Sequence, residues 1–192
     1  MVGDYVTILK GKEVRAKLLA GSNEAAEAVS TTFGPYGRNV AITMKYNVPS
    51  VTKDGAKVAG FIKLKDKANN VAAQLINQAA NETARVAGDG TTSTTVLTAS
   101  IVKRAFKSIE GKRRLFRNSI PGVQPMQLKR DLHIAMDAVL KDLDSLSKEV
   151  KQENIKSIAM VACNGDEAMA NMVTEAFKIV GGVIIGIIGF QM

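Results

Sequence analysis

The chain has 192 residues, of which 46% are hydrophobic and 23% are charged, with 16 glycines and 4 prolines. This composition is typical of a globular protein and excludes disordered, collagen-like and mucin-like chains. The net charge of +8 favours anionic partners such as phosphates, nucleic acid or an acidic membrane, without selecting among them. The one cysteine, Cys163, and the one histidine, His133, exclude an internal disulfide and a Cys/His zinc cluster.

The ends of the chain carry no predicted targeting or membrane segment. The N-terminal stretch lacks both the apolar run and the acid-free, Arg-rich composition of targeting peptides. Near the other end, residues 179–190 (IVGGVIIGIIGF) form the longest apolar run, which contains four glycines. Because a membrane-spanning helix needs about 20 apolar residues, this run favours a buried strand over a membrane anchor.

The first half of the chain predicts two helices with a hairpin between them. Apolar residues recur at helical spacing over residues 12–32, and a Gly-Pro turn follows. Two short β-branched runs, 39–44 and 48–51, predict a hairpin, and the turn residues 52–55 (TKDG) close it. Over residues 66–87 two neighbouring apolar rows repeat every four residues, so we expect a largely buried helix there.

The second half predicts only helices before the apolar tail. Gly88-Asp89-Gly90 ends the preceding helix, and a new helix is expected over residues 91–108, with Asp or Thr as its N-cap. An amphipathic pattern begins just after Pro125 and continues to Leu146. Two shorter helices are expected over residues 155–161 and 169–180, separated by a polar turn.

The loop 88–95 (GDGTTSTT) carries the sharpest chemical signal. A glycine-rich turn before a helix directs free backbone N–H groups and the positive end of the helix dipole at one point, which suits phosphate oxygens. Asp89 is a suitable ligand for Mg²⁺ shared with those phosphates. Taken alone, the same residues also fit a plain helix boundary without a ligand. The loops 31–38 (TTFGPYGR) and 52–55 alone predict only turns, and the Walker A spacing is absent.

Four sequence blocks in a fixed order carry a family resemblance. They are FGPYGRNV, VTKDGAKVA, GDGTTSTTVL and PMQLKRDL, which begin at residues 33, 51, 88 and 125. In these blocks, and over residues 2–180 as a whole, the sequence resembles group I chaperonin subunits, the GroEL family of bacteria and organelles. The resemblance implies a mainly α fold, a helical bundle with a small β-hairpin, similar to the N-terminal half of a chaperonin equatorial domain.

The same resemblance implies a site for ATP and Mg²⁺ built from the three loops. Asp89 would bind the magnesium ion, Asp54 would be the catalytic residue that helps to place the attacking water, and Lys53 would lie near the phosphates. The other residues implied to touch the nucleotide are Thr32, Phe33, Gly34, Pro35, Gly90, Thr91, Thr92, Ser93 and Asn164. Phosphoryl transfer depends mainly on positioning and charge stabilisation, which N–H groups, hydroxyls and one metal ion supply.

By this resemblance, residues 1–150 are part of an equatorial ATP-binding domain, with a basic insertion at about 110–121. Residues 151–192 are the end of the equatorial segment and the start of a truncated intermediate domain. The expected function is that of an ATP- and Mg-binding subunit of a chaperonin ring that assists protein folding. Because the family's hydrolytic aspartate and apical domain lie further downstream, ATP hydrolysis by this chain is left open, and unfolded clients are expected only for a longer product.

The chain departs from the family as a truncated and divergent member, which leaves two alternatives. One is a non-catalytic interaction protein that binds ring subunits. The other is a nucleic-acid binder through residues 103–117, where seven basic residues accompany one acid. Nucleic acid is the less favoured partner, since charged runs are usually only solvated. Ring subunits are the expected partners, and no binding to a membrane is expected. The expected compartment is the mitochondrial matrix, another organelle of bacterial origin or the bacterial cytoplasm.

Overall fold

The computed structural model describes residues 8–34, 36–44, 47–111, 121–163 and 165–180. Its elements are α1 (Gly11–Ser30), β1 (Val40–Met44), β2 (Asn47–Thr52), α2 (Gly55–Phe61), α3 (Lys67–Ala87), α4 (Thr91–Glu110), α5 (Pro125–Leu146), α6 (Gln152–Ala162) and α7 (Glu167–Val180). The chain divides into two compact units, residues 1–129 and 130–192, and α5 contains the boundary between them.

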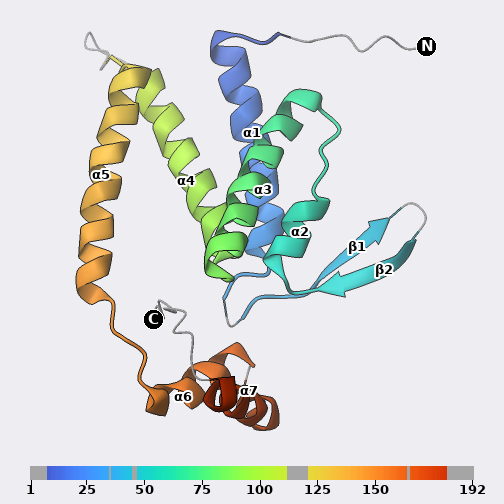
Figure 1. The fold of residues 1–192 in the computed structure, drawn as a ribbon. Coiled ribbons are helices and arrows are strands. Elements are labelled where there is room, and N and C mark those ends of the chain that lie inside the picture. Colours follow the sequence, from blue (N-terminus) through green and yellow to red (C-terminus); the bar gives the residue numbers. More distant parts are fainter. Residues whose placement is uncertain (1–7, 35, 45–46, 112–120, 164, 181–192) are drawn as a thin grey trace. The chain divides into compact units, whose positions relative to one another are not determined.

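Helices α1, α3 and α4 form the bundle of the first unit (Figure 1). Each of the three packs against the other two, and the short α2 contacts all of them. Helices α1 and α3 approach each other closely at Gly21, where an added Cβ would lie 2.0 Å from the carbonyl oxygen of Asn69. The core at this level is made mostly of alanines around Ile76, because larger side chains would separate helices that are so close.

A second core cluster lies where α1, α2 and β1 meet. Val29, at the end of α1, is fully buried against Val58 and Ala59 of α2, and Val40 and Ile42 of β1 pack against this cluster. The cluster therefore fixes the end of α1 and the start of α2, between which the chain forms the hairpin.

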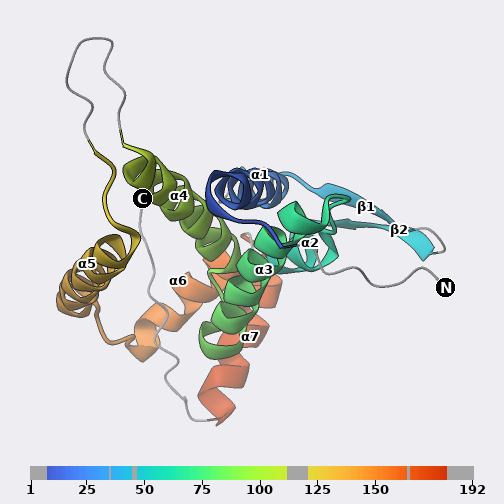
Figure 2. The ribbon, with the colours of Figure 1, turned by 90° about the horizontal axis from the view of Figure 1, so that it is seen from above.

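The hairpin pairs β1 with β2 in antiparallel register, with Val40 opposite Thr52 and Ile42 opposite Ser50. Both views show the two strands extending away from the helices (Figure 2). The predicted hairpin is confirmed. The first strand ends at Met44 as predicted, and each of the other three strand ends differs from its predicted position by one residue.

The helix predicted over residues 66–87 is confirmed, but only one of its two apolar rows is buried. Ala72, Ile76 and Ala80 are at most 3% exposed, whereas Val71 is 48% and Leu75 is 57% exposed. Periodicity identifies a face that is suited to burial, but packing against α1 and α4 covers only one row of α3.

The turn predicted at residues 52–55 is followed directly by α2, which the sequence patterns did not predict. This helix has seven residues and includes Gly60, so it is too short to show a recognisable helical repeat of apolar residues. The N-cap predicted for α4 is also wrong, because Gly90, with φ of 80°, takes that position without any side-chain cap.

The second unit contains the paired helices α6 and α7. Ala159 of α6 and Ala170 of α7 are buried, and Lys156 forms an ion pair of 3.1 Å with Glu167. Both helices confirm the prediction. Of the strand predicted at residues 179–190, Ile179 and Val180 instead end α7, and the remainder lies outside the described residues.

Within the described ranges, none of the helices combines the length and the hydropathy that a membrane span requires. The helix predicted after Pro125 is confirmed as α5, which has no buried residue.

Candidate functional site

The end of α1, the start of α2 and the start of α4 lie at the same end of the bundle (Figure 1). They meet at Gly55, where an added Cβ would lie 1.9 Å from Oγ1 of Thr92 and 3.1 Å from Oγ1 of Thr32. One contact point thus joins the loops 31–38, 52–55 and 88–95. The structure therefore brings together the three segments in which the sequence analysis placed the site.

The turn between α3 and α4 presents a helix N-terminus without a side-chain cap. Gly88 and Gly90 both have left-handed backbone conformations, with φ of 74° and 80°, and Asp89 lies between them. No side chain that the structure describes caps the first turn of α4, which begins with Thr91, Thr92 and Ser93. This end of the helix therefore offers N–H donors and a positive dipole to an anion.

The carboxylate of Asp89 is exposed at the tip of this turn. Its Oδ1 accepts a hydrogen bond of 2.6 Å from the N–H of Gly90, so the carboxylate turns toward its own loop and does not cap α4. An exposed carboxylate beside an uncapped helix N-terminus fits the preference of Mg²⁺ for carboxylate, phosphate and water oxygens. The residues present thus suit a magnesium ion bound together with phosphates.

The five hydroxyl residues 91–95 divide into two groups. Oγ1 of Thr94 lies 3.0 Å from Oγ1 of Thr83 and joins α4 to α3, and the fully buried Thr95 donates to the carbonyl of Thr91. These two hydroxyls are structural. Thr91 and Thr92 are half-buried and Ser93 is exposed, so the first three positions remain for a ligand.

Asp54 caps α2 beside the point where the loops meet. Its Oδ1 accepts hydrogen bonds of 2.9 Å from the N–H of Ala56 and 3.5 Å from that of Lys57. This is a structural role that the sequence analysis did not assign to Asp54. The preceding residue, Lys53, is half-buried. The cap holds the exposed carboxylate next to Gly55.

The loop after α1 is closed on itself. The N–H of Arg38 donates to the carbonyl of Thr31 at 2.7 Å, and Gly37 donates to Gly34 at 3.0 Å. Thr32 is 5% exposed, and its Oγ1 donates to the carbonyl of Val29 at 2.7 Å. Pro35 and Asn164, two of the predicted nucleotide contacts, lie outside the described residues.

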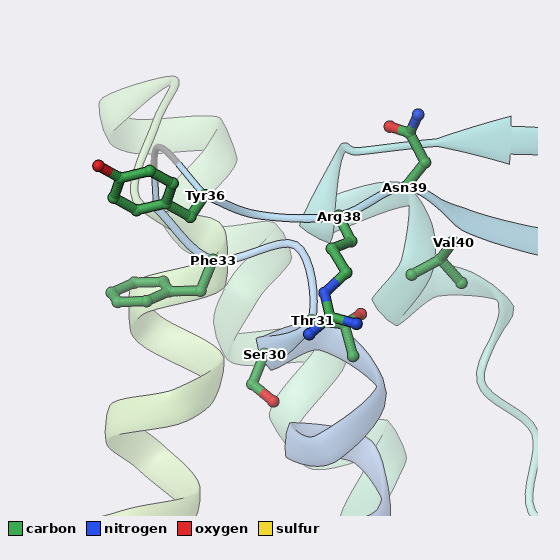
Figure 3. Close-up of a pocket in the computed structure, with 7 residues that line it drawn as sticks. All are labelled: Ser30, Thr31, Phe33, Tyr36, Arg38, Asn39 and Val40. Atoms are coloured by element: carbon green, nitrogen blue, oxygen red, sulfur yellow. The ribbon is translucent and has the colours of Figure 1, made fainter.

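The same loop borders an open pocket of about 560 Å³ that the sequence analysis did not identify (Figure 3). Its lining consists of Ser30, Thr31, Phe33, Tyr36, Arg38, Asn39 and Val40. Phe33 is the only predicted site residue among them. The aromatic residues three positions apart in a turn were the available signal for this pocket, but loop shape cannot be derived from spacing alone.

Metal clusters, His133 and the basic run were the other features that the sequence analysis considered. The described residues contain no group of three or more His, Cys, Asp or Glu side chains that would hold a metal ion. His133 is exposed on α5. Of the basic run, Lys103, Arg104 and Lys107 are exposed on α4, and residues 112–120 lie outside the described ranges.

Residues 25–184 match the sequence model of the TCP-1/cpn60 chaperonin family. The chain belongs to this family. It is 41% identical over 177 residues to heat shock protein 60A of Drosophila melanogaster and 39% identical over 180 residues to the mitochondrial chaperonin CPN60 of Euglena gracilis. These alignments cover 91% and 92% of the chain but 29% and 30% of the relatives, so the chain spans less than a third of their length.

A solved structure supports the same conclusion for the fold. The chaperonin gp146 from the bacteriophage EL 2 (Pseudomonas aeruginosa), crystallised in the presence of ATP-BeFx, matches with a TM-score of 0.73 and 28% identity. The match covers 90% of this chain and 29% of that one. The predicted resemblance to chaperonins and the mainly α fold with a small hairpin are therefore confirmed.

Proposed function

We propose that the chain binds Mg·ATP at the N-terminus of α4 and forms the nucleotide-binding part of a chaperonin subunit that assists protein folding in a ring. The observation that carries this proposal is the meeting of three loops at Gly55, in contact with Thr92 and near Thr32. A ligand at this point lies beside an uncapped helix N-terminus and an exposed aspartate.

Each loop has a distinct role in this proposal. The N–H groups and hydroxyls of the first turn of α4, residues 91–93, bind phosphate oxygens, with Gly90 allowing the close turn. Asp89 holds the magnesium ion, which supplies charge neutralisation when bound. Lys53 adds a positive charge, and Asp54, oriented by its cap on α2, places the attacking water.

The chaperonin relatives support the wider role. The phage chaperonin was crystallised with an ATP analogue, and two relatives are named as mitochondrial. We accordingly propose ring subunits as partners, and the mitochondrial matrix or a compartment of bacterial type as the location. Residues 1–150 are proposed as part of an equatorial domain, and residues 151–192 as the end of the equatorial segment and the start of the intermediate domain.

The test is thermal unfolding of the chain with and without Mg·ATP. A ligand present at about 100 times its dissociation constant stabilises the folded state by about 2.7 kcal/mol, so we expect a clear rise in Tm. Asp89→Ala removes the metal ligand at an exposed position and is expected to abolish this rise without changing the Tm of the ligand-free protein.

Arg113→Ala, in the basic stretch, is the control and is expected to retain the full rise. Equal loss of the rise in both variants would contradict the assignment of the site to Asp89. A cooperative transition that Mg·ATP does not shift in the unsubstituted protein would instead favour a chaperonin relative that acts only through protein contacts.

A further inference from the structure

Two threonine hydroxyls attach the start of α4 to the end of α3. Oγ1 of Thr83 donates to the carbonyl of Ala79 at 3.1 Å within α3. Oγ1 of Thr94 lies 3.0 Å from Oγ1 of Thr83. Because Thr83 already donates its hydrogen to Ala79, Thr94 is the donor of this second bond. The hydroxyls therefore form a chain of two hydrogen bonds that leads from α4 to the backbone of α3.

Thr94 also marks the limit of the free N–H groups of α4. Its own N–H donates to the carbonyl of Gly90 at 2.9 Å and closes the first turn of the helix. The N–H groups of residues 91–93 come before this bond and have no acceptor within the described part of the chain. These are the groups that the proposed function assigns to phosphate oxygens. The residue that is bonded to α3 is thus the one directly after the three free donors.

The turn between the two helices does not fix the direction of α4 by itself. Gly88 and Gly90 both have left-handed conformations, and glycine has the widest choice of backbone angles. Thr83 acts across this turn. Its hydroxyl is bonded to Thr94, and its Cγ2 would lie 3.8 Å from a Cβ added at Gly90. The side chain of Thr83 therefore lies next to both ends of the first turn of α4.

We propose that Thr83 and Thr94 are positioning residues, whose pair of hydroxyls holds the three free N–H groups of α4 in the orientation that binds phosphate. The inference rests on the proposed function. A hydrogen bond weakens steeply when the N–H turns away from its acceptor, and donors that are already oriented avoid an entropy cost on binding. Both hydroxyl hydrogens are donated within the protein, so the two threonines act through the first turn of α4 and not by contact with the ligand.

The test is isothermal titration of the full chain with Mg·ATP and with Mg·tripolyphosphate. Thr83→Val keeps the size and the Cγ2 methyl group of the side chain but removes the hydroxyl. We expect it to weaken the binding of both ligands by the same factor, about threefold to tenfold, and Thr94→Val to do the same. Because both substitutions break one bond, the double variant should bind about as weakly as either single variant. Thr83→Ser keeps the hydroxyl and should retain the affinity of the unsubstituted chain.

Ser22→Ala is the matched control for a purely structural loss. Ser22 is 3% exposed, and its Oγ donates to the carbonyl of Leu18 at 2.7 Å, so this variant also loses a hydroxyl bond of the same bundle. We expect its affinity for both ligands to be unchanged, whatever its Tm. The titrations are made well below the lowest Tm of the series, so that every variant is folded.

If the two valine variants bind Mg·tripolyphosphate as tightly as the unsubstituted chain, the positioning role is overturned and the phosphate site stands. The positioning role is also overturned if Thr83→Ser binds as weakly as Thr83→Val, because the hydroxyl then has no part in the loss. If the unsubstituted chain binds neither ligand, the proposed function fails and this inference fails with it.

Discussion

At Gly55, the absence of a side chain lets the hydroxyl of Thr92 approach the backbone at the start of α2. An added Cβ would lie 1.9 Å from that oxygen, which is far inside the distance that two such atoms tolerate. Gly60, in the same helix, has no atom within 4 Å of an added Cβ. The two glycines therefore differ in tertiary surroundings and not in secondary structure.

Gly55→Ala is expected to destabilise the protein by about 1–3 kcal/mol, because α2 must move away from α4 to relieve the overlap. Gly60→Ala, the matched control, is expected to be neutral or to stabilise by about 0.5–1 kcal/mol, as alanine favours a helix over glycine. Urea unfolding of both variants measures these differences. Thr92→Ala in the Gly55→Ala background should recover part of the loss, and a Gly55→Ala variant as stable as Gly60→Ala would refute the close contact.

At the scale of the elements, Asp66 connects α1 to α3 with both of its oxygens. Oδ1 caps α3 by accepting from the N–H groups of Ala68 and Asn69, and Oδ2 pairs with Lys17 of α1. The hydrogen bond from Lys17 and the two capping bonds lower the pKa of Asp66. The same hydrogen bond, to Asp66, raises the pKa of Lys17.

Because its pKa is lowered on folding, Asp66 stabilises the folded state above the ordinary aspartate pKa of 3.8, and this contribution is lost as the pH falls through the lower pKa of the folded protein. Asp66→Asn keeps an N-cap residue but removes the charge. We expect its Tm to be lower than that of the unsubstituted protein at pH 6 and the difference to shrink toward pH 2. The Tm of both proteins over this range measures the effect, and a constant difference would contradict a role for the charge.

At the scale of the whole molecule, the helices carry apolar rows that the described structure leaves exposed. On α3, Val71 and Leu75 form one such row, and on α4, Leu97 is 61% and Ile101 is 41% exposed. The overall composition is that of a globular protein. These rows are therefore exposed because the described elements do not cover them, and not because the sequence is unusually apolar. Exposed rows of this kind promote association between molecules.

We therefore expect the chain to bind a hydrophobic dye and to associate with increasing concentration. Leu75→Lys places a charge on the exposed row and should reduce both dye binding and association. It should change the Tm only slightly. Ile76→Lys, at the neighbouring position that is 3% exposed, should unfold the protein, since an unpaired charge cannot be buried there. Dye fluorescence and sedimentation velocity provide the readouts, and association that Leu75→Lys leaves unchanged would place the contact elsewhere.

The positions of the helices, except that of the short α2, followed from the sequence by itself. Asp66 and the periodic rows after it mark α3, and Pro125 marks the start of α5, because caps and hydrophobic periods involve only residues close in the chain. The segment most suited to phosphate, residues 88–95, was identified in the same way. The order of the four blocks then indicated the chaperonin family, which the match over residues 25–184 shows.

Only the tertiary structure decided which faces are buried and how the loops meet. The row at Leu75 is as apolar as that at Ile76, yet only Ile76 is buried, in a cluster with Ala25 of α1 and Ala99 of α4. Likewise, the meeting of the loops at Gly55 brings together Thr32 and Thr92, which are 60 positions apart in the chain. Local patterns cannot fix such contacts, because they depend on which elements pack together and on the small residues that let them approach.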